Sequence, residues 1–137
     1  MAIIPTSGLE NYALLLLRIF IGWIFIYHGW PKLVGGKKMA SQMGKPKMGG
    51  FLHFLGFAEI LGGLATLIGL LTQLANIGFV IVMVGAITTK ITQMKVKFSS
   101  HETTGWEFDF ILLGVAIALI IFGAGSISID AMLKFWP

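Results

Sequence analysis

Four apolar segments dominate the pattern of this chain, and each approaches the length of a membrane-spanning helix. They lie at about residues 11–30, 51–71, 74–93 and 108–124. A helix needs ~20 apolar residues to cross ~30 Å of hydrocarbon, and these runs lack the alternation of barrel strands. The pattern predicts an all-α integral membrane four-helix bundle with antiparallel up-down connections. The remaining tail, 126–137, is too short to span, and we expect it at the membrane interface.

The connections between these segments differ in length and in charge. Residues 71–74 leave room only for a tight hairpin, whereas loops 31–50 and 94–107 are long. Lysines gather on the side of these two loops, at positions 32, 37, 38, 45, 47, 90, 95 and 97, while the opposite side holds Lys134 alone. The positive-inside rule predicts a multi-pass protein of the cytoplasmic membrane, with both loops in the cytoplasm and both termini outside.

Composition supports a single membrane domain that covers residues 1–137. The chain is 56% hydrophobic and only 12% charged, which leaves too little polar surface for a soluble protein. The lack of cysteine excludes thiol relays and iron–sulfur ligation by this chain, and three separated histidines give no metal-site pattern. The sequence carries no signal for haem or nucleotide binding. We interpret the net charge of +4 as a topology signal and expect no nucleic-acid partner.

Arg18 lies near the middle of the first segment, where a charge is costly. A charged side chain at the centre of a membrane helix costs ~2.5–3.5 kcal/mol on insertion scales. Arg18 shares a helix stripe with glycines, and Glu59 lies on the corresponding small-residue stripe of the second helix. Their depths from the same membrane face are about 10 Å and about 18 Å, an offset that two long side chains can bridge. We therefore expect an intramembrane pair of Arg18 with Glu59.

The expected Arg18–Glu59 pair has two interpretations. It can be structural, because unpaired charge in lipid is costly and a pair fixes the register of the helices. It can also be functional, because ionisable residues inside membranes often mark paths for protons, ions or substrates. Spacing in the sequence does not separate these two interpretations.

A second group of polar residues lies toward the lysine-rich loops: His28, Lys32, His53, Glu107 and Asp109. In one interpretation, the charged and histidine side chains extend to the lipid headgroups, as long polar side chains commonly do. In the other, the group forms a pocket mouth where His28 and Glu107 meet a polar headgroup or pass protons. Trp23, Trp30 and Trp106 would supply aromatic walls in either case, although interfacial anchoring is the simpler explanation of these tryptophans.

Small residues line one face of each predicted helix. In membranes, glycines let two helix backbones approach closely, so this pattern indicates helix–helix contact. We assign helix packing to six of them: Gly22, Gly29, Gly62, Gly63, Gly69 and Gly114. A tightly packed bundle is the simplest explanation of the pattern.

Short motifs follow one another along nearly the whole chain. They are Leu-Leu-Arg-Ile-Phe-Ile-Gly at 16–22, His-Gly-Trp-Pro-Lys at 28–32, Ala-Glu-Ile-Leu-Gly-Gly at 58–63, Gly-Trp-Glu-Phe at 105–108 and Gly-Ala-Gly-Ser-Ile-Ser-Ile-Asp at 123–130. In this order they resemble the DoxX family of small four-helix membrane proteins. The resemblance implies a bacterial or archaeal membrane protein. The wider group includes the quinone-linked subunit of a thiosulfate:quinone oxidoreductase and a partner in a mycobacterial oxidoreductase complex.

Three functions compete, and the sequence leaves open whether the chain is an enzyme. The resemblance favours a redox-associated subunit that binds a quinone-type lipid or docks an oxidoreductase partner. An intramembrane Arg–Glu pair fits a small transporter or a proton or ion pathway, for which four helices would work mainly as a homo-oligomer. A lysine-rich first loop that holds anionic lipid or an acidic partner fits a non-catalytic membrane scaffold.

Overall fold

Every regular element in the described part of the chain is helical, as the sequence predicts. The computed structural model describes residues 6–135. Its α-helices are α1 (Glu10–Gln42), α2 (Gly49–Ile68), α3 (Thr72–Thr92), α4 (Glu107–Phe122) and α5 (Ile129–Leu133), and a 3₁₀ turn covers Pro46–Met48. No strand occurs among these residues.

Three of the helices are long and apolar enough to cross a membrane. They are α1, α2 together with the 3₁₀ turn before it, and α3. α4 has 16 residues, and at ~1.5 Å per residue it falls short of the ~30 Å hydrocarbon core. Within residues 6–135, three spans therefore qualify by length and composition, and α4 is a shorter fourth helix.

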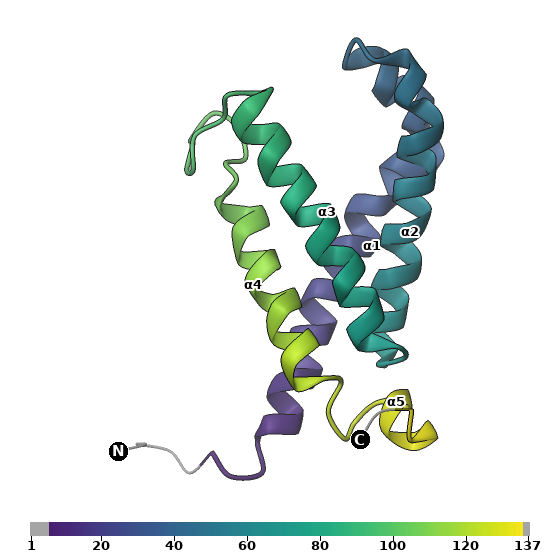
Figure 1. The fold of residues 1–137 in the computed structure, drawn as a ribbon, viewed down its shortest axis with the longest axis vertical. Coiled ribbons are helices and arrows are strands. Elements are labelled where there is room, and N and C mark those ends of the chain that lie inside the picture. Colours follow the sequence, from purple (N-terminus) through teal and green to yellow (C-terminus); the bar gives the residue numbers. More distant parts are fainter. Residues whose placement is uncertain (1–5, 136–137) are drawn as a thin grey trace.

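The four long helices form two hairpins that diverge from each other (Figure 1). α2 runs back along α1 to make the α1–α2 arm, and α4 runs back along α3 to make the α3–α4 arm. The arms meet near the end that holds the termini and separate toward the connections 43–48 and 93–106. At the separated end, the Lys45 ammonium donates a hydrogen bond to Gln93 Oε1 over 2.6 Å and links the two tips.

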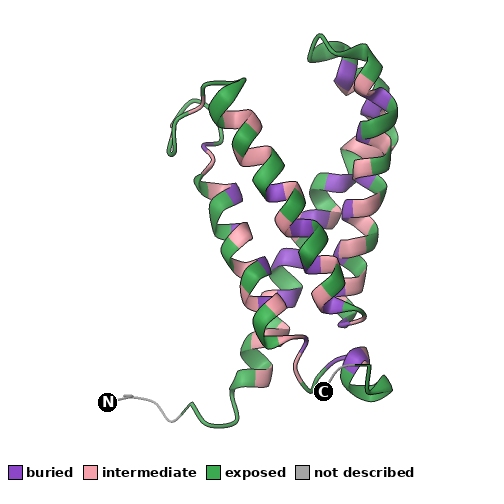
Figure 2. Cartoon of the chain, in the orientation of Figure 1, coloured by how far each residue is buried: buried purple, intermediate pink, exposed green. Residues whose placement is uncertain are grey.

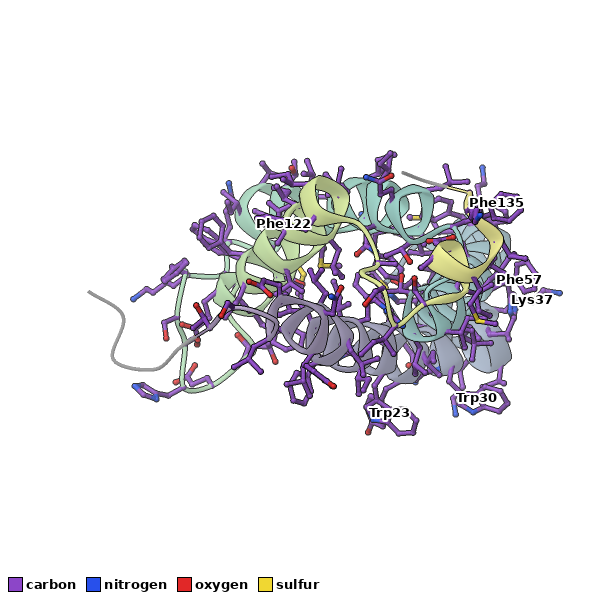
Figure 3. All side chains as sticks on the ribbon, turned by 90° about the horizontal axis from the view of Figure 1, so that it is seen from below. Trp23, Trp30, Lys37, Phe57, Phe122 and Phe135 are labelled. Carbon is purple, nitrogen blue, oxygen red and sulfur yellow. The ribbon has the colours of Figure 1, made fainter. Side chains whose placement is uncertain are left out.

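The apolar core lies where the arms meet. The rings of Phe25 in α1 and Phe79 in α3 stack with centroids 3.5 Å apart and planes 4° from parallel. The buried core cluster comprises Ile21, Phe25, Phe79, Met83, Leu112, Ala116 and Leu119. Figure 2 shows buried residues along the α1–α2 contact and at the junction of the arms, with exposed outer faces. In Figure 3, Trp23 and Trp30 point away from the helices, as expected for side chains in contact with lipid.

Glycines set the distance between α1 and α2. Gly22 faces Gly63 and Gly29 faces Gly56, and a Cβ atom built on any of these four would lie 2.5–2.7 Å from backbone of the other helix. One further heptad along, a Cβ on Gly36 would lie 3.1 Å from the Gly49 carbonyl oxygen. The two backbones therefore touch along three successive heptads, which only glycine permits.

The other glycines assigned to packing have different surroundings. A Cβ on Gly62 would meet the Phe79 ring at 2.9 Å, so this position receives α3. Gly69 ends α2 with φ of +73°, a conformation that favours glycine over any L-residue. Gly114 has open space around it, so the expected helix contact there is wrong: nothing lies within 4 Å of a Cβ built on it.

The proline at position 31 predicts that the first helix ends at Trp30, and this prediction is wrong. α1 continues through Pro31 to Gln42 and has one non-helical residue, Gly35, with φ of −129° and ψ of 20°. Pro31 removes only its own N–H from the helix, while the glycine contact with α2 continues beyond it. At the Gly35 kink, the Nδ1–H of His53 donates to the Leu33 carbonyl over 2.6 Å, which ties the extended end of α1 to α2.

The C-terminal tail, expected at the membrane interface, contains the short helix α5 and packs against the rest of the fold. After α4 the chain turns back beneath the α2–α3 junction and forms α5 (Figure 1). The Ser128 hydroxyl caps α5 by accepting a hydrogen bond from the Ala131 N–H over 3.1 Å. Asp130 is buried. Of the expected interfacial tail 126–137, residues 136 and 137 lie outside the described residues.

Candidate functional site

The Arg18 guanidinium joins three parts of the chain through backbone carbonyl groups. Its N–H groups donate to the carbonyl oxygens of Thr66 at 3.0 Å, Leu67 at 3.1 Å, Ala124 at 2.7 Å and Ile127 at 2.7 Å. Two of these acceptors belong to the last turn of α2 and two to the segment after α4. Arg18 itself is only 2% exposed.

The end of α2 explains why a cation is stable at this position. The last carbonyl groups of a helix have no partner within the helix, and the helix dipole places partial negative charge there. The fork of N–H donors in a guanidinium suits several acceptors held in fixed directions. Arg18 therefore supplies donors to the carbonyl groups of this junction, and it shares the Thr66 carbonyl with the Gly69 N–H at 3.2 Å.

Asp130 completes this junction from the C-terminal side. Its carboxylate accepts hydrogen bonds from the backbone N–H groups of Leu71 at 2.7 Å and Thr72 at 3.0 Å, at the start of α3. The Asp130 N–H donates to the Gly69 carbonyl over 2.8 Å. A carboxylate at a helix N-terminus is favoured by the exposed N–H groups and by the dipole. Arg18 and Asp130 thus bind opposite helix ends at the α2–α3 turn.

The expected direct pair of Arg18 with Glu59 does not form. Glu59 instead accepts hydrogen bonds from the Lys32 ammonium at both carboxylate oxygens, over 2.6 and 2.7 Å. Helix side chains lean toward the N-terminus of their own helix. Because α1 and α2 are antiparallel, Arg18 leans toward one end of the fold and Glu59 toward the other, so the offset in depth widens.

Each arm contains one ion pair, near the middle of α2 in the α1–α2 arm and near the 93–106 connection in the α3–α4 arm. Lys32 and Glu59 pair in the α1–α2 arm, with 24% and 2% of their side chains exposed. Lys90 and Asp109 pair in the α3–α4 arm over 2.6 Å, with 19% and 10% exposed. These are the two ion pairs within residues 6–135. In both, the carboxylate is the more deeply buried partner.

The residues expected at a pocket mouth do not converge on one site. Lys32 is taken by Glu59, and His53 by the Leu33 carbonyl. The other three lie toward α4. The exposed His28 ring lies against Phe108 with centroids 5.8 Å apart, Glu107 accepts a hydrogen bond from Ser99 over 3.1 Å, and Trp106 packs edge-on to Phe98.

An open apolar groove of about 940 Å³ follows α4. Its polar lining residues, Thr104 and Glu107, lie at the end nearest the 93–106 connection. The remaining lining is apolar: Leu17, Phe98, Phe108, Phe110, Ile111, Gly114, Val115 and Ala118. The open space at Gly114 belongs to this groove, which places a small residue where a ligand, rather than a helix, can lie against α4.

Comparison with known proteins places the chain in a family. Residues 13–93 match the sequence model of DoxX. The chain belongs to the DoxX family. A relative from Bacillus subtilis (strain 168), named "Putative oxidoreductase CatD", is 31% identical over 117 residues, which cover 85% of this chain and 83% of the relative. No solved structure matches the chain.

The DoxX match divides the charged groups described above. Arg18, the Lys32–Glu59 pair and Lys90 lie within the matched residues 13–93, whereas Asp109 and Asp130 lie beyond them. The sequence patterns indicate no partner for Asp130, and they do not pair Lys90 with Asp109. A sequence signal existed for Asp130, because an acidic residue just after Ser128 is typical of a capped helix start.

The Lys32–Glu59 pair predicts a contrast between single and double replacement. Lys32→Met leaves the Glu59 carboxylate buried without a partner and should destabilise the protein by ~3–5 kcal/mol. The double variant Lys32→Met/Glu59→Met removes both charges and should be near the wild-type stability or above it. Unfolding of the purified protein in detergent, followed by circular dichroism, measures both. Equal losses in the single and double variants would contradict this account of the pair.

Proposed function

We propose that this DoxX family member is a redox-associated membrane subunit that binds a quinone-type lipid in the groove along α4. The observation that carries the proposal is the distribution of groups in that groove: its polar side chains lie at one end of an otherwise apolar lining. A quinone-type lipid has the same division, with a polar ring at one end and a long apolar tail. The groove volume also falls within the range of small-molecule sites.

The residues of the groove fit such a ligand group by group. Phe98, Phe108 and Phe110 supply aromatic surface for a ring, since aromatic rings prefer stacked or edge-on contact. The Thr104 hydroxyl can donate a hydrogen bond to a ring carbonyl, and the Glu107 carboxylate can accept one from a hydroquinone hydroxyl. Bound there, a quinone would supply two-electron, two-proton chemistry, while the chain itself orients the ring.

The name of the Bacillus subtilis relative supports a redox association for this chain. That relative is called an oxidoreductase, whereas this chain has no cysteine and no metal-ligand cluster within the described residues. A subunit that binds a quinone and docks a separate oxidoreductase would be consistent both with the name of the relative and with the residues of this chain. In the same proposal α4 crosses the cytoplasmic membrane beside the three longer helices, although its 16 residues alone are shorter than the ~30 Å hydrocarbon core. The lysine-rich connections then face the cytoplasm, and the termini lie outside.

The other functions have less support. A gate formed by Arg18 and Glu59 has no geometric basis, because the two side chains have separate partners. A scaffold role rests on the exposed lysines of residues 37–47, which anionic lipid headgroups attract in many membrane proteins. Neither account uses the groove along α4.

Filling the groove tests the proposal. Gly114→Leu puts a side chain into open space inside the groove and should weaken quinone binding at least tenfold while the protein stays folded. The matched control is Gly78→Leu, another helical glycine with open space around it that does not line the groove. Quenching of tryptophan fluorescence by a short-chain quinone measures affinity, and extraction with mass detection measures quinone that co-purifies.

Two outcomes would overturn the quinone assignment. One is wild-type protein that purifies without quinone and shows no saturable quenching. The other is an equal loss of binding in Gly114→Leu and Gly78→Leu, which would mean that the effect comes from the helix surface in general and not from the groove.

A further inference from the structure

A second pocket, of about 360 Å³, lies where the connection from α4 to α5 passes the start of α3. Its lining residues are Gln73, residues 121–126, Ser128, Asp130 and Ala131. This pocket and the groove along α4 share none of their described lining residues. A ligand of the pocket is therefore independent of any quinone in that groove.

The pocket lies where two helices of spanning length end. α2, with the 3₁₀ turn before it, and α3 are both long and apolar enough to cross a membrane, and residues 69–71 join them. Asp130 holds α5 and the connection before it against this turn. On α4, Ile121 and Phe122 line the pocket while 68% and 71% of their surfaces are exposed. This position suits the headgroup of a lipid whose chains lie along the exposed apolar surface of α4.

The first wall of the pocket, the acceptor wall, is formed by Gln73 and Asp130. The Gln73 amide N–H donates to the Ile120 carbonyl over 2.7 Å, whereas its Oε1 is buried and has no donor within residues 6–135. The Asp130 carboxylate accepts two backbone N–H groups, and a carboxylate has about four acceptor sites. The last carbonyl groups of α4 add partial negative charge beside them. This wall matches a cation with several N–H donors, such as a primary ammonium.

The second wall, the donor wall, is formed by Gly125 and Ser126. The Ala124 carbonyl accepts a hydrogen bond from Arg18 over 2.7 Å. Because the C=O and the N–H of one planar trans peptide point in opposite directions, the Gly125 N–H points away from Arg18. No acceptor for that N–H lies in the described part of the chain. The exposed Ser126 hydroxyl lines the pocket beside it, and both groups can donate to an anionic oxygen.

The charges around the pocket select among ligand classes. Arg18 and Asp130 together are neutral, so a simple cation or a simple anion would leave a net charge in partly apolar surroundings. A zwitterion keeps the sum at zero and provides partners for both walls. We propose that the pocket binds a phosphoethanolamine group, with its ammonium at the acceptor wall and its phosphate at the donor wall.

Related headgroups lack one of the two matching parts. A choline group has the same charges, but its quaternary nitrogen carries no N–H for Gln73 Oε1. A phosphoglycerol group has a phosphate and no cation. Phosphoethanolamine is available both as the headgroup of phosphatidylethanolamine and as a soluble molecule, and the exposed Ile121 and Phe122 favour the lipid.

Native mass spectrometry of the full chain in mild detergent tests the proposal. Titration with phosphatidylethanolamine, phosphatidylcholine and phosphatidylglycerol of identical acyl chains gives three dissociation constants for the wild-type protein. The first should be at least tenfold lower than the other two. Competition by soluble phosphoethanolamine separates the sources: displacement of the lipid at equal concentration assigns the site to the soluble molecule, and displacement only in large excess assigns it to the lipid.

Replacement of one glutamine locates the site. Gln73→Met removes the buried acceptor, so the affinity for phosphatidylethanolamine should fall to that for phosphatidylcholine, which should not change. Gln93→Met is the matched control, because Gln93 lies at the opposite end of α3 and does not line the pocket. Equal affinities of the wild-type protein for the three lipids overturn the proposal, and this ranking does not depend on the folding of any variant. A full preference for phosphatidylethanolamine in Gln73→Met also overturns it.

Discussion

Replacing Arg18 with methionine is expected to leave the protein without a stable fold. The change removes four hydrogen bonds and leaves four backbone carbonyl groups at the α2–α3–α5 junction without their charged donor. The Thr66 carbonyl keeps the Gly69 N–H as a donor, and each of the other three acceptors costs ~1–3 kcal/mol when it loses Arg18. The sum is comparable to the ~5–15 kcal/mol that stabilises a typical domain.

The measurement is the fraction of protein that elutes as a single species in mild detergent, together with its thermal unfolding midpoint. Arg18→Lys is the informative companion, because an ammonium keeps the charge but cannot reach four carbonyl groups in fixed directions. We expect it to fold with a clearly lowered midpoint. If Arg18→Met unfolds no earlier than Arg18→Lys, the carbonyl contacts do not hold the junction together.

Gly56→Ala is expected to disrupt the contact between α1 and α2. A Cβ at this position would lie 2.5 Å from the Leu33 backbone nitrogen and 2.6 Å from the Gly29 carbonyl oxygen. Both atoms belong to the backbone of α1, so relief requires α1 and α2 to move apart along their contact. The loss of stability should reach at least ~3 kcal/mol, the upper end of the usual cost of overpacking.

Two other glycines provide the control for this experiment. Gly114→Ala and Gly78→Ala introduce the same methyl group where nothing lies within 4 Å. Alanine is the better helix former by ~0.5–1 kcal/mol, so both variants should be slightly more stable than wild type. Chemical unfolding in detergent compares the three. A loss at Gly56 no larger than at Gly78 would show that the α1–α2 contact tolerates a side chain.

Much of the helical framework can be read from the apolar runs. The segments of spanning length predict the positions of α2, α3 and α4 to within a few residues. The end of α1 could not be predicted, because proline normally stops a helix and only the glycine contact with α2 shows why this helix continues. The fold of the tail depends on Arg18 and Asp130, whose partners are backbone groups and leave no mark in the sequence.

The charged residues show where helix-face arguments fail. The helix-face and depth arguments correctly predict that Arg18 and Glu59 are buried. They assume, however, that a side chain can extend equally well in either direction along the helix axis. The lean of side chains toward the helix N-terminus reverses the outcome for antiparallel helices. The same rule favours Lys32 with Glu59, because those two side chains lean toward each other. The groove along α4 depends on surface shape, which no periodicity encodes.

The partners of Arg18 also set the order in which the protein can be completed during synthesis. Each hairpin pairs its own lysine with an acid, so neither ion pair has to wait for the other arm to be made. Arg18 obtains two acceptors once α2 is made, but the carbonyl groups of Ala124 and Ile127 become available only after α4 has been synthesised. A chain cut short before Ala124 therefore keeps an incompletely bonded arginine in the membrane. We expect such a product to be removed by membrane proteases, while the full-length chain persists.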